Sequence, residues 1–306
     1  MTPWIVVPIF NEAPTIAAVV AAARAYAPVL VVDDGSSDDG AARARAAGAE
    51  VIRHPRRLGK GQALRTGLAA TRQRGASHVV TLDGDGQHAP ADLPALLAAS
   101  VRAPHAIVVG GRLGEDEMTL LSDRVNAIRL ASFFVDWASG LRVADTQSGF
   151  RVYPARLFDR IRPRRGGFVF ETEVLMLAAA AGVPVVEVPV TVIPRAGRRS
   201  RFRPVADGIA VGTYVAARTL ERWGAEVRAA VRLRAWWRHP RPAAAAAGAT
   251  LLAPAVLAVV LAQSLGLLPD VFTVLVRRLY GYDRLDATPA TAPPMVERET
   301  AVVPSP

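Results

Sequence analysis

The sequence predicts an α/β fold in which a mostly parallel, doubly wound sheet carries helices on both faces. Over the first 110 or so residues, short β-branched runs alternate with helix-like stretches, which is typical of strand-helix-strand units. The runs are continuously apolar, so we expect strands that are covered on both sides. With 306 residues, of which 51% are hydrophobic and 21% charged, the chain is long enough for one large domain and an appendage.

Strands and helices are expected in the following order. The strands cover residues 4–7, 29–32, 51–52, 79–82 and 107–109, with helices between them. Farther along, helices are expected over 119–139, 154–162 and 171–182, and a strand over 185–192. A long helix is then expected over 207–237, where Leu220, Trp223, Val227 and Val231 recur at spacings of three and four among arginines. This last pattern predicts a basic amphipathic helix.

An uncharged stretch near the C-terminus predicts a membrane segment. No charged residue occurs between Arg241 and Asp270, and ten Leu or Val residues lie between 251 and 268. The stretch is long enough to span a bilayer, while its alanine-rich composition also fits a buried or interfacial helix, and both interpretations stay open. Arginines precede the stretch and no signal-peptide pattern precedes the first strand, so we expect a cytoplasmic N-terminal domain.

Four regions are therefore expected along the chain. Residues 1–205 form the α/β domain, 206–242 a basic amphipathic region at the membrane interface, 243–276 a hydrophobic membrane segment, and 277–306 a disordered tail.

Cysteine content and charge exclude several classes of function. The chain has no cysteine, so disulfides and thiolate chemistry are excluded, and a metal ion would need oxygen or imidazole ligands. Twelve arginines and three acidic residues lie between 195 and 241, which accounts for nearly all of the formal net charge of +10. This region shows no pattern of aromatic residues interleaved for base stacking, so it favours an anionic membrane surface over nucleic acid.

Polar clusters follow three of the expected strands. Residues 8–12, 33–38 and 83–88 come directly after the first, second and fourth strands. In doubly wound sheets, ligands bind outside the carboxyl ends of the strands. We therefore expect the three loops to share one edge of the sheet.

The loop over residues 83–88, Asp-Gly-Asp-Gly-Gln-His, predicts a metal site. Asp83 and Asp85 are two apart on an extended chain, so both carboxylates can face one cation, and Gly84 allows close approach of a ligand. Carboxylate and amide oxygens suit Mg²⁺ or Mn²⁺, with the remaining positions filled by substrate phosphates. Gln87 or His88 would add a ligand. A structural turn is the alternative.

Two further loops carry groups suited to a nucleotide. Asp34, at the end of the second strand, resembles the acidic residue that hydrogen-bonds a nucleotide hydroxyl or base edge, although aspartates also form turns. Lys60 is the only lysine in the chain and stands between Gly59 and Gly61 at the start of a helix. A cation there favours an anionic substrate, but the spacing is not that of a P-loop.

Taken in order, these motifs resemble the family 2 glycosyltransferases. The series is residues 8–12 (Pro-Ile-Phe-Asn-Glu), 32–38 (Val-Asp-Asp-Gly-Ser-Ser-Asp), 59–61 (Gly-Lys-Gly), 83–88 and 145–151 (Asp-Thr-Gln-Ser-Gly-Phe-Arg). The branch most similar is that of the polyprenyl-phosphate sugar transferases, which includes dolichyl-phosphate mannosyltransferase. The resemblance covers residues 3 to about 205. It implies a GT-A type, Rossmann-like nucleotide-binding sheet, a nucleotide-diphospho-sugar donor, a polyprenyl phosphate acceptor and inversion at the anomeric carbon.

The resemblance also implies roles for individual residues. The nucleotide-sugar would be bound by Pro8, Phe10, Glu12, Val32, Asp34, Lys60, Asp83, Gly84, Arg195 and Arg201, and the metal by Asp83, Asp85 and Gln87. Arg112 and Arg124 would bind the acceptor phosphate. Gly111 stands where the family has serine and Arg201 where it has lysine, so the contact geometry at Arg201 would differ from that of the family.

Catalysis would be mainly electrostatic. A divalent ion at Asp83 and Asp85 would stabilise the charge on the departing diphosphate. A phosphate monoester acceptor is already ionised near neutral pH and needs no strong base, whereas a sugar hydroxyl requires one. Asp145, Glu171 and Glu173 are the candidates for such a base, although acidic residues also favour a helix N-terminus.

The expected function is thus hexose transfer to a polyprenyl phosphate at the cytoplasmic membrane face. One alternative is a transferase acting on a glycolipid or polysaccharide hydroxyl. Another is a non-catalytic, arginine-rich protein that binds lipid or nucleic acid. Acidic loops at the ligand edge disfavour the last, because they would repel phosphates in the absence of a cation. The donor's base and sugar and the oligomeric state are not predicted.

Overall fold

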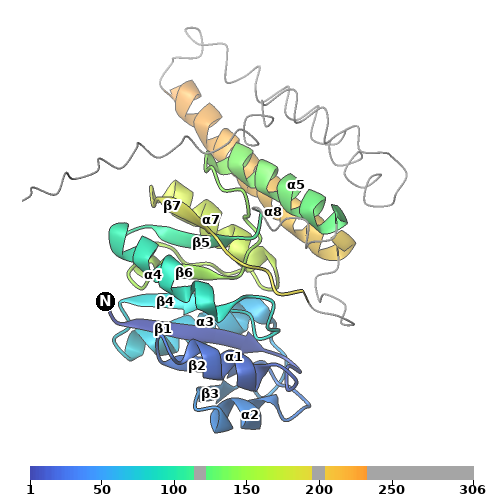
Figure 1. The fold of residues 1–306 in the computed structure, drawn as a ribbon. Helices are drawn as coiled ribbons and strands as arrows, with labels where there is room; N and C mark the ends of the chain where they lie inside the picture. The colour runs from blue at the N-terminus through green and yellow to red at the C-terminus, as the bar shows by residue number, and fades with distance from the viewer. Residues whose placement is uncertain (114–121, 195–203, 233–306) are drawn as a thin grey trace, which may run out of the picture. The chain divides into compact units, whose positions relative to one another are not determined.

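The computed structural model describes residues 1–113, 122–194 and 204–232, and within these residues it contains one seven-stranded sheet (Figure 1). The strands are β1 (Pro3–Ile9), β2 (Val29–Asp33), β3 (Glu50–Arg53), β4 (His78–Thr81), β5 (Ile107–Gly111), β6 (Arg151–Pro154) and β7 (Val185–Pro189). Their order across the sheet is β3-β2-β1-β4-β6-β5-β7. Only β6 runs antiparallel to its neighbours, β4 and β5. The predicted mostly parallel α/β sheet is confirmed.

Helices cover both faces of this sheet, as predicted. On one face pack α1 (Ile16–Ala23), α2 (Gly40–Ala46) and α4 (Leu93–Arg102), the last preceded by a short 3₁₀ turn, η1 (Pro90–Asp92); on the other pack α3 (Lys60–Gln73), α6 (Leu157–Arg160) and α7 (Val169–Ala180). Side chains of strand β1 contribute to two hydrophobic cores, one on each face of the sheet. Ile5 and Val7 belong to the first core and Val6 to the second, because successive side chains of a strand point to opposite faces.

Two segments differ from the prediction. Strand β6 was not expected, and the helix expected over 154–162 is reduced to the single turn of α6. A four-residue strand that begins with an arginine carries too little apolar pattern to be recognised. In addition, the strand expected over 185–192 ends at Pro189, where β7 stops. The other boundaries that fall on described residues agree to within about three positions, the usual uncertainty of helix and strand ends.

Two long helices form a third, smaller core. These are α5 (Ser122–Ser139) and α8 (Pro204–Arg232), and the cluster includes Val135, Met176 and Val211. Trp137 of α5 meets Trp223 of α8 edge to face, with ring centroids 5.5 Å apart. In the described part of the chain, no helix is long and apolar enough to cross a membrane. The predicted membrane segment 243–276 and tail 277–306 lie outside the described residues.

Candidate active site

The carboxyl ends of β1, β2 and β4 lie side by side, because these strands are adjacent and parallel. From β1 the chain proceeds through β2 to β3 on one side and then crosses to β4 on the other. The point where the winding reverses therefore lies between β1 and β4, which is where ligands bind in open α/β sheets. The loops after β1 and β4 flank this point, and the loop after β2 is next to them.

Hydrogen bonds tie these three loops together. Asn11, which adopts a left-handed conformation with φ of 54°, accepts the Ser37 N–H through Oδ1 at 2.8 Å. The hydroxyl of Thr15, just before α1, donates to the Gly84 carbonyl at 2.8 Å. A Cβ at position 84 would lie 2.6 Å from Ile9 Cγ2, so glycine is required for the close approach of the two loops. The end of β1 and the start of α1 thus hold the loop that carries Asp83 and Asp85.

Lys60, the first residue of α3, connects two carboxylates at this edge. Its Nζ lies 2.8 Å from Asp83 Oδ1 and 2.9 Å from Glu171 Oε1. Burial opposes the charge on Asp83, but Lys60, with His88 and Arg112, outweighs it and lowers the pKa of Asp83 to about 2. Burial likewise opposes the charge on Lys60, and the two carboxylates outweigh it and raise the pKa of the ammonium. Both groups are therefore charged at neutral pH.

Gly149 leaves the space around this ion pair open. A Cβ at position 149 would lie 2.9 Å from Asp83 Oδ2 and 3.0 Å from Lys60 Nζ. The Thr81 hydroxyl of β4 donates to the Gly149 carbonyl at 2.7 Å and holds the backbone in place. Any side chain at 149 would therefore press on the Asp83–Lys60 pair.

The donor set of the 83–88 loop suits a hard divalent ion. Asp85 Oδ1 accepts the Gln87 N–H at 3.0 Å, and His88 is buried and stacks on Phe150 with centroids 5.2 Å apart. Burial lowers the pKa of His88. Among the described residues, no three or more His, Cys, Asp or Glu side chains gather around one point. Two carboxylates with an amide nearby fit Mg²⁺ or Mn²⁺ only if substrate oxygens complete the shell, which is usual for ions that bind with phosphates.

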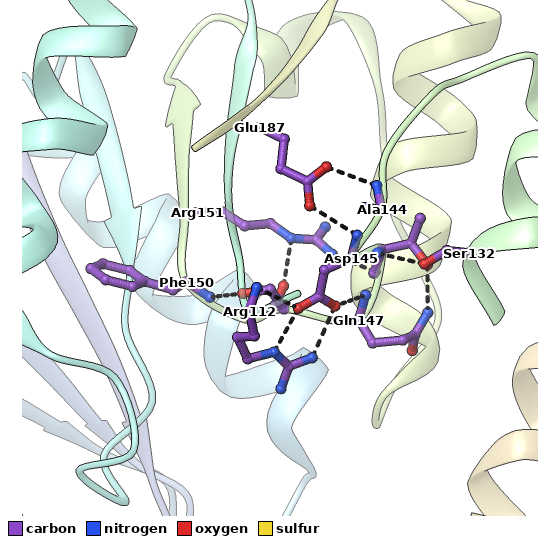
Figure 2. A network of polar contacts seen from close by, with 10 residues as sticks. Arg112, Ser132, Ala144, Asp145, Gln147, Phe150, Arg151 and Glu187 are labelled. Atoms are coloured by element: carbon purple, nitrogen blue, oxygen red, sulfur yellow. Dashed lines mark hydrogen bonds and ion pairs between the residues drawn. The ribbon is translucent and has the colours of Figure 1, made fainter. Parts of the chain in front are cut away.

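Arg112, directly after β5, forms a buried bidentate pair with Asp145 (Figure 2). Its Nε donates to Asp145 Oδ2 at 2.6 Å and its Nη2 to Oδ1 at 2.9 Å, and the Gln147 N–H also donates to Oδ1, at 3.1 Å. Although burial opposes its charge, Asp145 has a lowered pKa because Arg112 and these N–H groups stabilise the carboxylate. Both oxygens of Asp145 are thus engaged, and the geometry favours holding Arg112 over acting as a base. Arg112 is close enough to Asp83 and Asp85 for their charges to raise its pKa, after the larger effects of burial and Asp145.

The two glutamates of α7 differ in their surroundings. Glu173 Oε2 accepts the N–H groups of Arg164 and Arg165 at 2.8 and 2.6 Å, and so anchors the loop before α7. Glu171 is 3% exposed, and its carboxylate pairs with the Lys60 ammonium, with Oε1 2.9 Å from Nζ. Of the two, Glu171 is the one that faces the Asp83 loop.

Asp34 holds a neighbouring loop. Its oxygens accept the N–H groups of Leu58 and Gly59 at 2.8 and 2.7 Å and contact His54 Nδ1 at 2.8 Å. These bonds set the loop that opens α3 and therefore the position of Lys60. The sequence predicts that Asp34 binds the nucleotide, and its contacts inside the chain give it a structural role.

The other residues predicted to bind the nucleotide lie at the same edge or in the core beneath it. Pro8 is part of β1, and Phe10 follows it with the Arg57 guanidinium 4.4 Å above its ring. Glu12 and Val32 are buried, at 5% and 0% exposed. Arg195 and Arg201 lie outside the described residues, as does the side chain of Arg124 on α5.

Arg151 is a residue whose importance sequence reasoning missed. It is fully buried at the start of β6, and its Nε, Nη1 and Nη2 donate to the carbonyls of Ser148, Glu171 and Thr146 at 2.7, 2.8 and 2.7 Å. It thereby joins the loop before β6 to the start of α7. The available signal in the sequence was a charged residue, Arg151, directly before the apolar pair Val152-Tyr153.

The protonation of Asp136 in α5 should make the stability of the fold depend on pH. Burial, aided by Glu187, raises its pKa to about 7, against the Val143 N–H and Arg142, which lower it. Because this pKa exceeds the ordinary aspartate value of 3.8, the folded protein holds a proton that the unfolded chain releases, and stability falls as the pH rises from 3.8 to about 7. Asp136→Asn removes this effect. We expect the variant to melt above the wild type at pH 8 and the gap to shrink toward pH 5, and an equal gap at both pH values would contradict the assignment.

The chain matches the model of glycosyl transferase family 2 over residues 4–162. The chain belongs to this family and is therefore a glycosyltransferase. It is 33% identical over 210 residues to the glycosyltransferase AglJ of Haloferax volcanii, with 67% of each chain covered. It is 30% identical over 235 residues to the undecaprenyl-phosphate mannosyltransferase of Micrococcus luteus, covering 73% of this chain and 94% of that one. It is 29% identical over 205 residues to the polyprenol monophosphomannose synthase of Mycolicibacterium smegmatis, covering 62% and 77%.

Solved structures agree with this placement. The chain resembles the glucosyl-3-phosphoglycerate synthase of Mycobacterium tuberculosis with a TM-score of 0.55 at 25% identity, covering 72% of this chain and 80% of that one. The same enzyme in complex with Mn²⁺, uridine-diphosphate and phosphoglyceric acid gives a TM-score of 0.55, again at 25% identity, covering 72% and 78%. The resemblance drawn from the sequence motifs, to family 2 and its polyprenyl-phosphate branch, is confirmed.

Proposed function

We propose that this glycosyltransferase moves a hexose from a nucleotide-diphospho-sugar to a polyprenyl phosphate, with inversion, at the cytoplasmic face of the membrane. The carrying observation is that β4 and β5 end at the same edge of the sheet, which places Arg112, held by Asp145, close enough to Asp83 and Asp85 for their charges to interact. Asp83 and Asp85 would hold a metal ion and the donor diphosphate, and Arg112 beside them would bind a second anionic substrate. The names of two relatives, the undecaprenyl-phosphate mannosyltransferase and the polyprenol monophosphomannose synthase, support a polyprenyl phosphate as that anion.

The donor would bind at the loop after β4. Asp83, Asp85 and Gln87 would hold Mg²⁺ or Mn²⁺, which when bound supplies Lewis-acid stabilisation of the diphosphate leaving group. The glucosyl-3-phosphoglycerate synthase solved with Mn²⁺ and uridine-diphosphate, which this chain resembles, supports this choice. Lys60 adds a permanent ammonium beside the same loop. Pro8, Phe10, Glu12, Val32, Asp34 and Gly84 would shape the nucleotide side of the site, and Arg195 and Arg201 would contact the diphosphate.

The acceptor phosphate would bind at Arg112, together with Arg124. A phosphate monoester has a second pKa of about 6, so most of it is doubly ionised at pH 7. Such an acceptor attacks without a strong general base. Arg112 offsets the repulsion between two anionic substrates. Asp145, whose two oxygens are bonded to Arg112, keeps that guanidinium in place.

Helix α8 would lie against the bilayer. Its exposed side chains include Ile209 and Leu220, at 42% and 56% exposure, which suits an apolar interface. Two of its arginines have partners inside the chain, since Arg218 pairs with Glu221 and Arg222 donates to the Ala138 carbonyl. Each further basic residue near an anionic leaflet would contribute about 1 kcal/mol.

Glu171 favours a second candidate, transfer to the hydroxyl of a glycolipid or polysaccharide. The buried Glu171 carboxylate lies beside the loop proposed to hold the metal and pairs with the Lys60 ammonium, and a hydroxyl acceptor needs a general base at such a place. The two functions therefore predict different effects of Glu171→Gln on the rate of sugar transfer. Transfer to a phosphate would retain a pathway without a base, whereas transfer to a hydroxyl would be lost.

Labelled-sugar transfer by the full chain in membranes tests the proposal. A panel of nucleotide sugars is offered with a short polyprenyl phosphate, a glycolipid or a polysaccharide. We expect one donor to give an acid-labile sugar phosphate on the polyprenyl acceptor. Product on the hydroxyl acceptors alone, lost in Glu171→Gln, would replace the proposal by the second candidate.

A further inference from the structure

Three parts of the chain meet behind Arg112: the end of β5, the loop over residues 143–147, and β7 (Figure 2). Glu187 of β7 accepts the Ala144 N–H through Oε2 at 2.7 Å and the Asp145 N–H through Oε1 at 2.9 Å. A carboxylate that receives two successive backbone N–H groups fixes the orientation of the peptide unit between them. Glu187 therefore sets the backbone from which the Asp145 side chain projects.

The Glu187 side chain reaches this loop by passing over Gly111. Strands β5 and β7 are parallel, with Val109 opposite Glu187 and Gly111 opposite Pro189. Because residues two apart on a strand share a face, Gly111 and Glu187 lie on the same side of the sheet. A Cβ at position 111 would lie 2.3 Å from Glu187 Oε1 and 2.9 Å from its Cδ.

The space at Gly111 is therefore a condition for the two Glu187 hydrogen bonds. A side chain there would turn Glu187 away, because its carboxylate is the atom group in contact. This accounts for glycine at a position where the sequence resemblance leads one to expect serine. Glycine at position 111 and the two hydrogen bonds of Glu187 therefore depend on each other.

We propose that Glu187 is a positioning residue for Arg112, acting through Asp145, and that Gly111 provides the clearance it needs. Glu187 fixes the backbone of Asp145, and Asp145 holds the guanidinium at both oxygens. A second tether acts on the same loop, since the Thr146 N–H donates to Ser132 Oγ of α5 at 3.0 Å. The inference rests on the proposed function, in which Arg112 binds the acceptor phosphate.

A double-mutant cycle tests this arrangement. The variants are Glu187→Ala, Gly111→Ala and the pair, and rates of hexose transfer are measured against polyprenyl phosphate and against the nucleotide sugar. We expect each single variant to lower kcat/KM for the acceptor about ten- to a hundredfold, with the donor KM within about twofold, because misplacing a binding group is costly. The pair should be no worse than Glu187→Ala, since both changes remove the same contacts.

Controls separate this inference from the function on which it rests. Glu50→Ala changes a glutamate on β3, the opposite edge strand, and should leave both substrates unaffected. Arg112→Lys keeps the charge but not the bidentate fork, and should weaken the acceptor alone. If Arg112→Lys has no effect, the proposed role of Arg112 fails. If Arg112→Lys weakens the acceptor and Glu187→Ala does not, only the positioning role fails.

Two further outcomes would also overturn the positioning role. The first is a double variant whose loss of acceptor kcat/KM equals the product of the two single losses, because Gly111 would then act independently of Glu187. The other is an equal loss for donor and acceptor, which would indicate a general change in the fold. If Glu187→Ala does not fold, Glu187→Gln keeps the side-chain volume and replaces one acceptor by a donor, and its acceptor kcat/KM should fall between those of the wild type and Gly111→Ala.

Discussion

Asp85→Asn is expected to reduce hexose transfer by about a hundred- to a thousandfold, the usual effect of removing one group that stabilises charge in the transition state. The substitution keeps the size of the side chain and an oxygen able to accept the Gln87 N–H. It removes one negative charge from the two carboxylates proposed to hold the divalent ion. Initial rates at saturating donor and acceptor measure the loss, and thermal unfolding measures the fold.

Asp39→Asn is the matched control for this experiment. Asp39 precedes α2 and pairs with Arg43 on the surface at 2.8 Å, with 58% of its side chain exposed. An exposed pair of this kind contributes about 0–1 kcal/mol, so both rate and melting temperature should stay close to those of the wild type. A rate for Asp85→Asn equal to that of Asp39→Asn would remove Asp85 from the proposed metal site.

Arg151→Met should destabilise the fold by about 3 kcal/mol or more, because each buried acceptor left without a partner costs about 1–3 kcal/mol. The methionine fills similar space but leaves three buried carbonyl oxygens, those of Thr146, Ser148 and Glu171, without the donors they have now. Each such loss is costly because a buried acceptor without a partner is also cut off from water. For a domain of this size the melting temperature should fall by roughly 10 °C or more.

Arg156→Met provides the comparison for Arg151→Met, because Arg156 is exposed at the start of α6. Surface substitutions usually change stability by less than about 0.5 kcal/mol. Arg151→Lys should recover only part of the loss, since an ammonium is shorter and cannot span three carbonyls spread around a planar guanidinium. Equal melting temperatures for Arg151→Met and Arg156→Met would show that the buried guanidinium does not hold the 146–151 loop.

The main strands could be predicted because each is a continuous apolar run. Strands β1, β2, β4 and β5 lie inside the sheet or are buried, and each contains a run of two or more consecutive apolar residues, so local pattern suffices. Strand β6 could not be predicted from local pattern, because its first residue is a buried arginine. The guanidinium donates to carbonyls that lie up to 20 residues away in the sequence. The insertion of β6 between β4 and β5 depends on those distant contacts.

The candidate site was predictable in its location but not in its pairings. The resemblance implied that Asp83 and Lys60 both bind the nucleotide-sugar, yet it did not imply their contact with each other, which links positions 23 residues apart. The same residue type serves as a ligand or as a structural acceptor according to its partners. Glu173 accepts two backbone N–H groups while Glu171 pairs with the Lys60 ammonium, and spacing along α7 carries no sign of that difference.

Calorimetric titration of UDP and GDP tests most directly whether Asp83 and Asp85 bind a nucleotide diphosphate through a divalent ion. The full chain is titrated with each nucleotide in Mn²⁺, in Mg²⁺ and in excess EDTA, alongside Asp85→Asn in Mn²⁺. We predict that at least one nucleotide binds with a divalent ion present, and that EDTA and Asp85→Asn each weaken it by about tenfold or more, which corresponds to 1.4 kcal/mol. Binding of equal affinity in EDTA, unchanged in Asp85→Asn, would contradict the account.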